Sequence, residues 1–275
     1  MKTVRGQTPA GAWIYGECRP ASLAGLVDLM WSFEGPTACR RKRVFPNGRL
    51  ELMVNLGEPY AVAGDPVLVD GGLCGLQRGP VVLEQPARQR ILGLRLRPAG
   101  AYALLPAPQW EVAGRFIGLE DAFGAAGREL VARCHEAPGM EARFAVALRW
   151  VTERLARADG PDRAVGWCAR QIEQSGGLAS INDLRQQLGF SAPRLLAAFR
   201  EQVGLTPKLY ARTVRFSRLL RLLQEGRSSL VEAALDAGYY DQPHMTAEFR
   251  ELGGITPRGF LASRHAVGDG TTAAG

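Results

Sequence analysis

Two segments in the last third of the chain carry side chains whose chemistry suits the recognition of DNA bases. An arginine guanidinium can donate two hydrogen bonds to guanine, and a glutamine amide can pair twice with adenine. Arg194 offers the first kind of contact and Gln242 the second. The predicted base-contacting residues share the outward faces of two predicted helices; they are Pro193, Arg194, Ala197, Gln242, Pro243, His244 and Thr246. For His244 the sequence leaves two interpretations open, a base contact or a capping and packing role.

Basic residues beside these faces are predicted to bind phosphate groups. The predicted phosphate contacts are Lys208, Arg212, Arg215 and Arg250. The stretch 208–227 holds six Lys or Arg residues against a single glutamate, which favours an anionic partner. Arginines three residues apart nevertheless wind around a helix of about 3.6 residues per turn, so we expect some of them only to face solvent.

The two segments are copies of one unit. Residues 191–207 return as residues 241–257, with eight of the seventeen positions identical. Repeat proteins of the solenoid type need three or more stacked units to bury a core. A single duplication therefore indicates two equivalent recognition modules rather than a solenoid.

Local signals predict how each module folds. Ser191 and Asp241 can accept hydrogen bonds from the backbone at a helix start, and each is followed two places later by a proline. Apolar residues four apart follow each cap, and glycines at 189 and 238 end the preceding helical stretches. A helix, a glycine turn and a capped second helix form the helix-turn-helix pattern, whose second helix enters the DNA major groove. A linker helix over 208–227 is predicted to join the modules.

With these motifs in this order, residues 163–262 resemble the paired helix-turn-helix domain of the AraC/XylS family of bacterial transcription regulators. The resemblance rests on the turn at 189–191, the Gly-Leu-Thr-Pro stop at 204–207, the linker helix and the stretch 234–249. It implies specific binding to double-stranded DNA and contact with RNA polymerase. In many such regulators it also implies a homodimer and a small-molecule effector.

The sequence departs from the family pattern at Arg185, where a small residue is usual. The first module is therefore expected to be looser than the second. Its outward positions are also poor in hydrogen-bonding groups, so we expect the second recognition helix to discriminate more bases.

The first 157 residues are predicted to form a separate β-rich domain. Short apolar runs between residues 43 and 96 predict strands, and helices are expected over 21–30, 100–105, 119–135 and 140–156. The predicted fold class is α+β with two domains, a β-rich sensor-like domain at 1–157 with trailing helices and an all-α DNA-binding domain at 163–262. The tail 266–275 is expected to be disordered because it has little apolar surface to bury.

Two segments of this first domain, 43–48 and 96–101, resemble an N-terminal domain that recurs fused to such DNA-binding halves. That resemblance does not identify a ligand. The domain is expected either to bind a small-molecule effector or to serve only as a scaffold for a dimer.

Composition limits the other function classes. The net charge of +7 suits an anionic partner. Three histidines and five scattered cysteines lack metal-ligand spacing, so no metal or other cofactor is expected. The absence of nucleotide-binding and acyl-transfer motifs argues against an enzyme, and the absence of a span of about 20 apolar residues favours the cytoplasm. The alternative is a ligand-binding or interaction protein with a degenerate DNA-binding domain.

Overall fold

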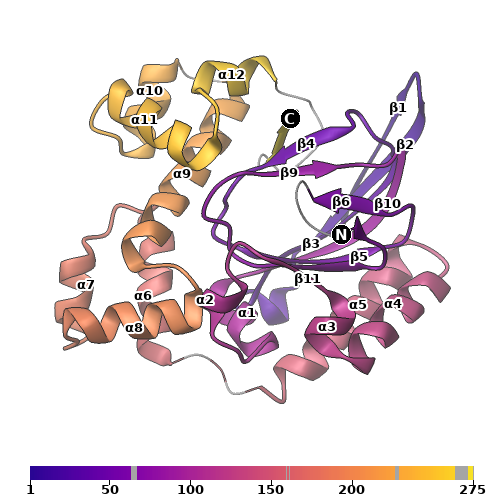
Figure 1. Ribbon diagram of the computed structural model, residues 1–275, viewed down its shortest axis with the longest axis horizontal. Coiled ribbons are helices and arrows are strands. Elements are labelled where there is room, and N and C mark those ends of the chain that lie inside the picture. Colours follow the sequence, from indigo (N-terminus) through magenta and orange to yellow (C-terminus); the bar gives the residue numbers. More distant parts are fainter. Residues whose placement is uncertain (63–66, 159, 161, 227–228, 264–271, 275) are drawn as a thin grey trace.

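A computed structural model describes residues 1–62, 67–158, 160, 162–226, 229–263 and 272–274. A β-rich half carries helices on one side, and a helical half lies beside it (Figure 1). The predicted α+β class, with a β-rich region followed by helices, is confirmed.

The β-rich half contains two antiparallel sheets. The larger sheet has the order β1-β2-β3-β10-β5-β8-β11, and the smaller has the order β12-β4-β9-β6-β7. The larger sheet consists of β1 (Lys2–Thr8), β2 (Gly11–Cys18), β3 (Val27–Pro36), β10 (Arg88–Leu96), β5 (Leu50–Asn55), β8 (Gly71–Cys74) and β11 (Phe116–Gly118). The smaller consists of β12 (Thr272–Ala274), β4 (Arg41–Val44), β9 (Val81–Glu84), β6 (Tyr60–Val62) and β7 (Val67–Leu68).

The prediction of a helix over 21–30 is wrong. Only a short 3-10 turn, η1 (Ala21–Leu23), forms there, and β3 begins at Val27. β3 lies between β2 and β10 and bonds to both strands, so pairing with distant segments overrides the local helical pattern.

Five helices follow the strands. They are α1 (Pro98–Leu104), α2 (Gln109–Val112), α3 (Leu119–Phe123), α4 (Ala125–Glu136) and α5 (Met140–Leu155). The helices predicted over 100–105 and 140–156 are confirmed, apart from small shifts at their ends. The helix predicted over 119–135 is in fact two helices, because Gly124 takes a left-handed φ of 58° that breaks the helix between them.

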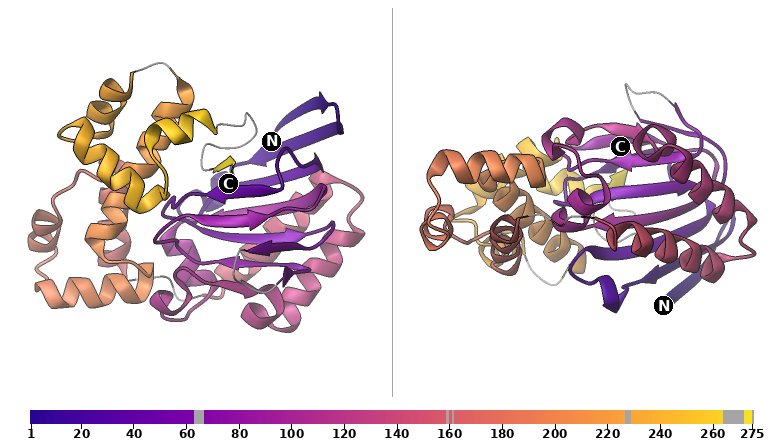
Figure 2. Two further views of the ribbon diagram at one scale, coloured as in Figure 1. Left: turned by 45° about the horizontal axis from the view of Figure 1, so that its top comes forward. Right: turned by 90° about the horizontal axis from the view of Figure 1, so that it is seen from below.

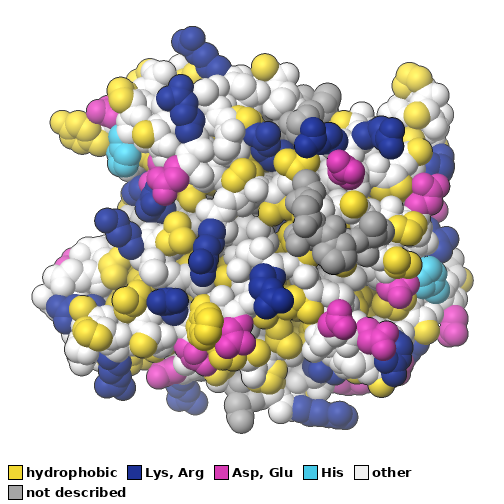
Figure 3. Space-filling view, in the orientation of Figure 1, with side chains coloured by type: hydrophobic (Ala, Val, Ile, Leu, Met, Phe, Trp, Pro, Cys, Tyr) yellow, Lys and Arg dark blue, Asp and Glu magenta, His cyan; other side chains and the backbone are white. Residues whose placement is uncertain are grey.

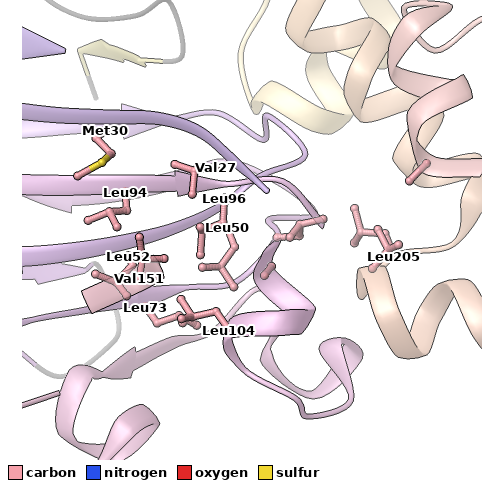
Figure 4. Packing of buried hydrophobic residues seen from close by; sticks show 14 of the residues in the cluster. Val27, Met30, Leu50, Leu52, Leu73, Leu94, Leu96, Leu104, Val151 and Leu205 are labelled. Atoms are coloured by element: carbon pink, nitrogen blue, oxygen red, sulfur yellow. The ribbon is translucent and has the colours of Figure 1, made fainter. Parts of the chain in front are cut away.

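The faces of the larger sheet have different partners. Strand residues alternate between faces, so Leu50, Leu52 and Val54 pack with the helices while Glu51 and Met53 point between the two sheets. The helices α3, α4 and α5 cover the outer face (Figure 2). Figure 4 shows buried side chains of this main core, including Leu94, Leu96 and Val151, together with Leu205 of the helical half, which belongs to the same cluster.

The helical half contains seven helices within the described residues. They are α6 (Arg163–Gln174), α7 (Ile181–Gln187), α8 (Ala192–Val203), α9 (Pro207–Glu225), α10 (Leu230–Ala237), α11 (Gln242–Gly253) and α12 (Pro257–Ala262). The predicted caps are confirmed, because Ser191 accepts from the Arg194 N–H at 3.4 Å and Asp241 accepts from the His244 N–H at 2.8 Å. The turn glycines Gly189 and Gly238 have left-handed φ values of 63° and 89°.

The helix-turn-helix pairs are therefore α7–α8 and α10–α11, joined by the predicted linker helix α9. The two apolar residues predicted to face inward in each second helix are buried; they are Leu195, Phe199, Met245 and Phe249. In α10 the side chains of Ala233, Ala234 and Ala237 are buried, whereas Val231 is half exposed.

Most of the predicted disordered tail falls outside the described residues. Residues 264–271 and 275 are among those not described. Residues 272–274 form strand β12, which pairs with β4. Backbone N–H and C=O groups make such pairing without any apolar side chain.

One contact between the two halves is made by a segment that we call the clasp, residues 43–49, which comprises the end of β4 and the residues that lead to β5. Its Phe45 is 1% exposed and lies in an aromatic cluster of the second module. The Phe45 ring centroid is 6.1 Å from that of Phe216, 6.5 Å from that of Phe249 and 5.5 Å from that of Phe260, all in edge-to-face geometry. The N-terminal half thus supplies one side chain to the core of the second module.

The other end of the clasp holds the first module. The Arg49 guanidinium donates to Glu173 of α6 at 3.0 Å and to the Tyr210 hydroxyl of α9 at 3.1 Å. Arg97, just before α1, pairs with Glu173 through a second nitrogen-oxygen contact of 2.5 Å. The two segments singled out in the sequence thus both lie at Glu173: Arg49 directly follows 43–48, and Arg97 lies within 96–101.

Candidate nucleic-acid interface and effector cavity

The predicted base-contacting residues lie on the outer faces of α8 and α11. Pro193, Arg194, Ala197, Pro243 and His244 are exposed, while Gln242 and Thr246 are half-buried. Lys208 and Arg250, predicted to contact phosphate, are also exposed. The first turns of α8 add the exposed Leu196, so Arg194 stands there among apolar groups.

Neighbouring rings orient two of the exposed side chains. The Arg194 guanidinium carbon lies 4.0 Å from the centre of the Phe190 ring, in the geometry of a cation–π contact. The His244 ring packs edge-on against Tyr239 with a centroid distance of 5.4 Å. Asp241 performs the capping at this helix start, so the exposed His244 ring has a packing contact and is not the cap.

Arg212 and Arg215 have carboxylate partners that the sequence analysis did not anticipate. The buried Glu248 of α11 accepts from Arg212 Nε at 2.8 Å and from Arg215 Nη2 at 2.9 Å. Arg212 also pairs with Glu251, donating through Nη1 at 3.0 Å. These arginines join the linker helix α9 to the second recognition helix, so their guanidinium groups are engaged within the protein.

The hydroxyl of Tyr239 completes the network by donating to Glu248 at 2.8 Å. Burial opposes ionisation of Glu248, but hydrogen bonds from Arg215, Arg212 and Tyr239 outweigh it, and the pKa of this carboxyl is lowered. The pKa of Tyr239 is raised, first by burial and then by the nearby Glu248 charge. The carboxylate is thus ionised and the phenol protonated at neutral pH.

A groove of about 520 Å³ lies where the two modules meet. It is lined by α9 and α11 and by the residues that lead into α7, and Lys208, Arg215 and His244 are among its side chains. On the face shown in Figure 3, Lys and Arg side chains are spread over the helical half rather than gathered in one patch.

The β-rich half holds a cavity of about 500 Å³ between its two sheets. Side chains of β2, β3, β5 and β10 line one side, and side chains of β4, β6 and β9 line the other. Burial raises the pKa of the Cys74 thiol in its wall to about 12, so this cysteine stays protonated and is a poor nucleophile. A volume of this size is typical of small-molecule sites.

Two further observations concern the described part of the chain. No group of three or more His, Cys, Asp or Glu side chains there is arranged to hold a metal ion. None of its helices has the length and apolar character that crossing a bilayer requires.

Comparison with known proteins identifies the helical half. Residues 184–263 match a family model described as a helix-turn-helix domain, and residues 17–117 match a model described as a domain of unknown function, DUF6597. The transcriptional regulator YbfI of Bacillus subtilis, described as uncharacterized, is 38% identical over 66 residues, which are 24% of each chain. The F1 operon positive regulatory protein of Yersinia pestis is 37% identical over 70 residues, 26% of this chain and 23% of that protein.

These matches span about a quarter of the length of the curated relatives. Residues 184–263 thus form a helix-turn-helix domain of the AraC type. The predicted recognition is confirmed there.

Solved structures extend the likeness to the fold of the whole chain. ToxT from Vibrio cholerae has a TM-score of 0.50 and 9% identity, over 85% of this chain and 98% of that one. A ToxT structure bound to (E)-4-(8-methylnaphthalen-1-yl)but-3-enoic acid has a TM-score of 0.50 and 11% identity over 85% of this chain and 98% of that one. At this identity the likeness concerns the fold alone.

At position 185 the family pattern usually has a small residue, and the larger Arg185 side chain is held by contacts within its own module. The Arg185 guanidinium donates to the Phe190 carbonyl at 2.8 Å and to Asn182 Oδ1 at 2.9 Å. The side chain therefore lies along the turn and binds it, which counts against the looser first module expected from the sequence.

Sequence reasoning missed Tyr240, which is 88% exposed directly before the cap of α11. No apolar spacing marks it, because it stands outside the helix. The signal that could have found it is the extra residue between Gly238 and the cap, since the first module has one residue fewer between Gly189 and Ser191.

Proposed function

We propose that the protein is a transcription regulator that binds a specific DNA sequence through α8 and α11. The observation that carries this proposal is the pair of capped recognition helices on one continuous linker. The 19 residues of α9 span about 28 Å at ~1.5 Å per residue, which suits two helices about one DNA turn apart, near ~34 Å. The proposal assigns no catalytic step to the chain, and it places the protein with its DNA in the cytoplasm.

Base discrimination is proposed to come mainly from the second recognition helix. Gln242, His244 and Thr246 give α11 three polar groups, whereas α8 has Arg194 among Pro193 and Ala197. Lys208 and Arg250 are proposed to contact phosphates. Arg212 and Arg215 are proposed instead to position α11, because their guanidinium groups bind Glu248.

The cavity between the sheets is proposed as the effector site. Its size and its enclosure by two sheets support this assignment. The ToxT structure that holds a naphthalene-containing acid shows that a protein of this fold has been captured with a small molecule. RNA polymerase is proposed as a further partner, as is a second copy of the chain.

A gel-shift titration against the region upstream of the protein's own gene tests the DNA function. Binding is expected to be saturable, and it should weaken steeply between a low and a high salt concentration. The variant Arg250→Ala should bind more weakly, while Arg149→Ala, which removes an exposed arginine on α5 in the other half, serves as the matched control and should bind like the wild type.

The alternative function, a ligand-binding or interaction protein, has one observation in its favour. The outer face of α8 is largely apolar and includes Leu196, which is 41% exposed. Salt-independent or absent DNA binding, in a protein that still binds small molecules, would support this alternative over the regulator.

A further inference from the structure

The cavity between the sheets has an unusually aromatic wall. Six aromatic side chains line it, and they are Trp13, Tyr15, Trp31, Phe33, Tyr60 and Phe116. Aliphatic side chains fill much of the remaining wall; they include Val44, Met53, Val81, Leu83 and Ile91. Aromatic rings favour stacking or edge-on contact with another ring, so the shape and chemistry suit a flat ligand.

Several polar groups in the wall are already used by the protein. The Asn55 amide donates to the Glu58 and Val69 carbonyls at 3.0 and 2.7 Å. The Gln77 amide donates to the Gly75 carbonyl at 2.9 Å. A sugar or another polyol needs many hydrogen-bond partners, and this wall offers it few.

The charges of the described wall cancel. Arg95 pairs with Glu51, which also accepts from the Trp31 indole at 3.2 Å. Lys42 and Glu58 carry opposite charges. A ligand carboxylate would enter a site whose arginine already has a carboxylate partner, and it would lose its hydration there.

We infer that the cavity binds a neutral, flat aromatic molecule of one or two fused rings. The inference rests on the proposed effector response, but its test measures ligand binding without DNA, so the two can fail separately. Isothermal titration calorimetry on the full chain should give saturable binding of 2-naphthol. Binding of 2-naphthoate, which has the same ring system with a carboxylate, should be at least tenfold weaker, and xylose should not bind.

Variants locate the site. Phe33→Ala should weaken 2-naphthol binding at least tenfold, and Leu83→Trp, which fills the cavity from β9, should do the same if Phe33→Ala does not fold. The control Trp110→Ala removes an exposed aromatic group on α2, outside the wall, and should leave binding unchanged. Equal or tighter binding of 2-naphthoate, or binding insensitive to both cavity variants, would overturn the inference.

A second observation concerns β4, a strand shared by the cavity and the second module. Lys42, Val44 and Asn47 line the cavity. Phe45 lies in the aromatic cluster of the second module, and the Arg43 guanidinium lies beside Gly254, the residue that ends α11. Successive residues of a strand point to opposite faces, and Phe45, the residue directly after β4, lies on the same side as Arg43. One short segment therefore contacts both the cavity and the second module.

The Arg43 side chain reinforces this contact. Its Nε and Nη1 atoms are buried and have no hydrogen-bond partner among the described residues. The C-terminal end of a helix carries a partial negative charge, so a guanidinium beside the end of α11 is favourably placed. Arg43 and Phe45 thus hold α11 at its end and at its core.

We propose that β4 transmits occupation of the cavity to the second recognition module by shifting Phe45 and Arg43. Any ligand that displaces Val44 must also move its two neighbours along the chain, Arg43 and Phe45. Arg49 holds α6 at Glu173 and α9 at Tyr210, and the first module, which packs against both helices through α8, keeps its position. Occupation therefore changes the placement of α11 relative to α8.

Hydrogen exchange measured by mass spectrometry on the full chain tests the proposed transmission without a ligand or DNA. Val44→Trp places a larger side chain in the cavity and so imitates a ligand that displaces residue 44. It should speed exchange in α10–α12 at least tenfold, with little change in α6–α8. Ile91→Trp adds comparable bulk to the cavity from β10 in the larger sheet and should leave exchange in α10–α12 unchanged.

A double-variant cycle adds a second criterion. If Phe45 carries the signal, Phe45→Ala alone speeds exchange in α10–α12, and adding Val44→Trp produces little further change. Unchanged exchange in α10–α12 for Val44→Trp, or full additivity of the two substitutions, would overturn the proposal.

Discussion

At the scale of single residues, Glu248 accepts hydrogen bonds from two arginines of α9 and from Tyr239 in the turn between α10 and α11. Its pKa is lowered in the folded protein because hydrogen bonds from Arg215, Arg212 and Tyr239 outweigh the cost of burial. A carboxyl with a lowered folded-state pKa stabilises the fold above its unfolded pKa, and this contribution is lost as the pH falls through the folded pKa.

We therefore expect Glu248→Gln to lower the free energy of unfolding at neutral pH by roughly 1.5–3 kcal/mol, the range for hydrogen bonds to charged groups. The difference from the wild type should shrink as the pH falls below the ordinary glutamate pKa of about 4.3, where the unfolded chain takes up the proton, and it should vanish below the lowered pKa of the folded protein. Thermal melts of both proteins at several pH values measure this. A difference that is constant with pH would show that the charge on Glu248 is not what stabilises the network.

Gln242 gives a second prediction at the residue scale. Gln242→Ala should cost about 1–3 kcal/mol at one preferred base pair and relax the choice of base there. Binding to a set of DNA sites that differ at single positions measures the effect. If Arg194→Ala altered the base preference and Gln242→Ala did not, the first recognition helix would be the main determinant of sequence.

At the scale of elements, the helical half was predicted from sequence far better than the β-rich half. Caps such as Ser191 and Asp241, and turn glycines such as Gly189, act within one or two helical turns, so their effect is legible in a short stretch of sequence. The strands β1, β2 and β3 form through pairing with other strands, and β3 pairs with β10 about sixty residues away. Such pairing leaves little local signal.

The candidate site was only partly predictable for the same reason. The outward position of Arg194 and His244 follows from helical spacing, and the structure places both on the surface. The engagement of Arg215 by Glu248 depends on how α9 crosses α11, which spacing along one helix does not determine. The insertion of Phe45 into the second module depends on the packing of both halves.

The isolated fragment 163–262 is predicted to fold and bind DNA, because its caps, turns and linker lie within it. It should nevertheless be less stable than the same region in the full chain, since it lacks Phe45. Removal of a buried phenylalanine side chain typically costs about 3–5 kcal/mol. Thermal melts of the fragment, of the full chain and of Phe45→Ala measure this loss of stability. A fragment as stable as the same region in the full chain would show that the aromatic contact contributes little.

At the scale of the whole molecule, the charge pattern predicts how DNA binding responds to salt. Removing one side chain that binds a phosphate reduces the slope of affinity against salt concentration by about one unit in a log–log plot. Lys208→Ala and Arg250→Ala should each show this reduction and weaken binding to all DNA sequences alike. Arg215→Ala should instead lower thermal stability. A reduced salt slope without any decrease in stability would show that Arg215 binds a phosphate, as first predicted from the sequence.

The pairing of Arg49 and Arg97 with Glu173 also restricts how such proteins can be recombined. A chimera that joins this β-rich half to a foreign DNA-binding half would bury the Arg49 side chain, which is 13% exposed here, against whatever replaces Glu173 and Tyr210. An uncompensated buried charge is costly. Exchange of halves should therefore succeed only between parents that carry a carboxylate at the position of Glu173, and each pair of halves is expected to be inherited as a matched set.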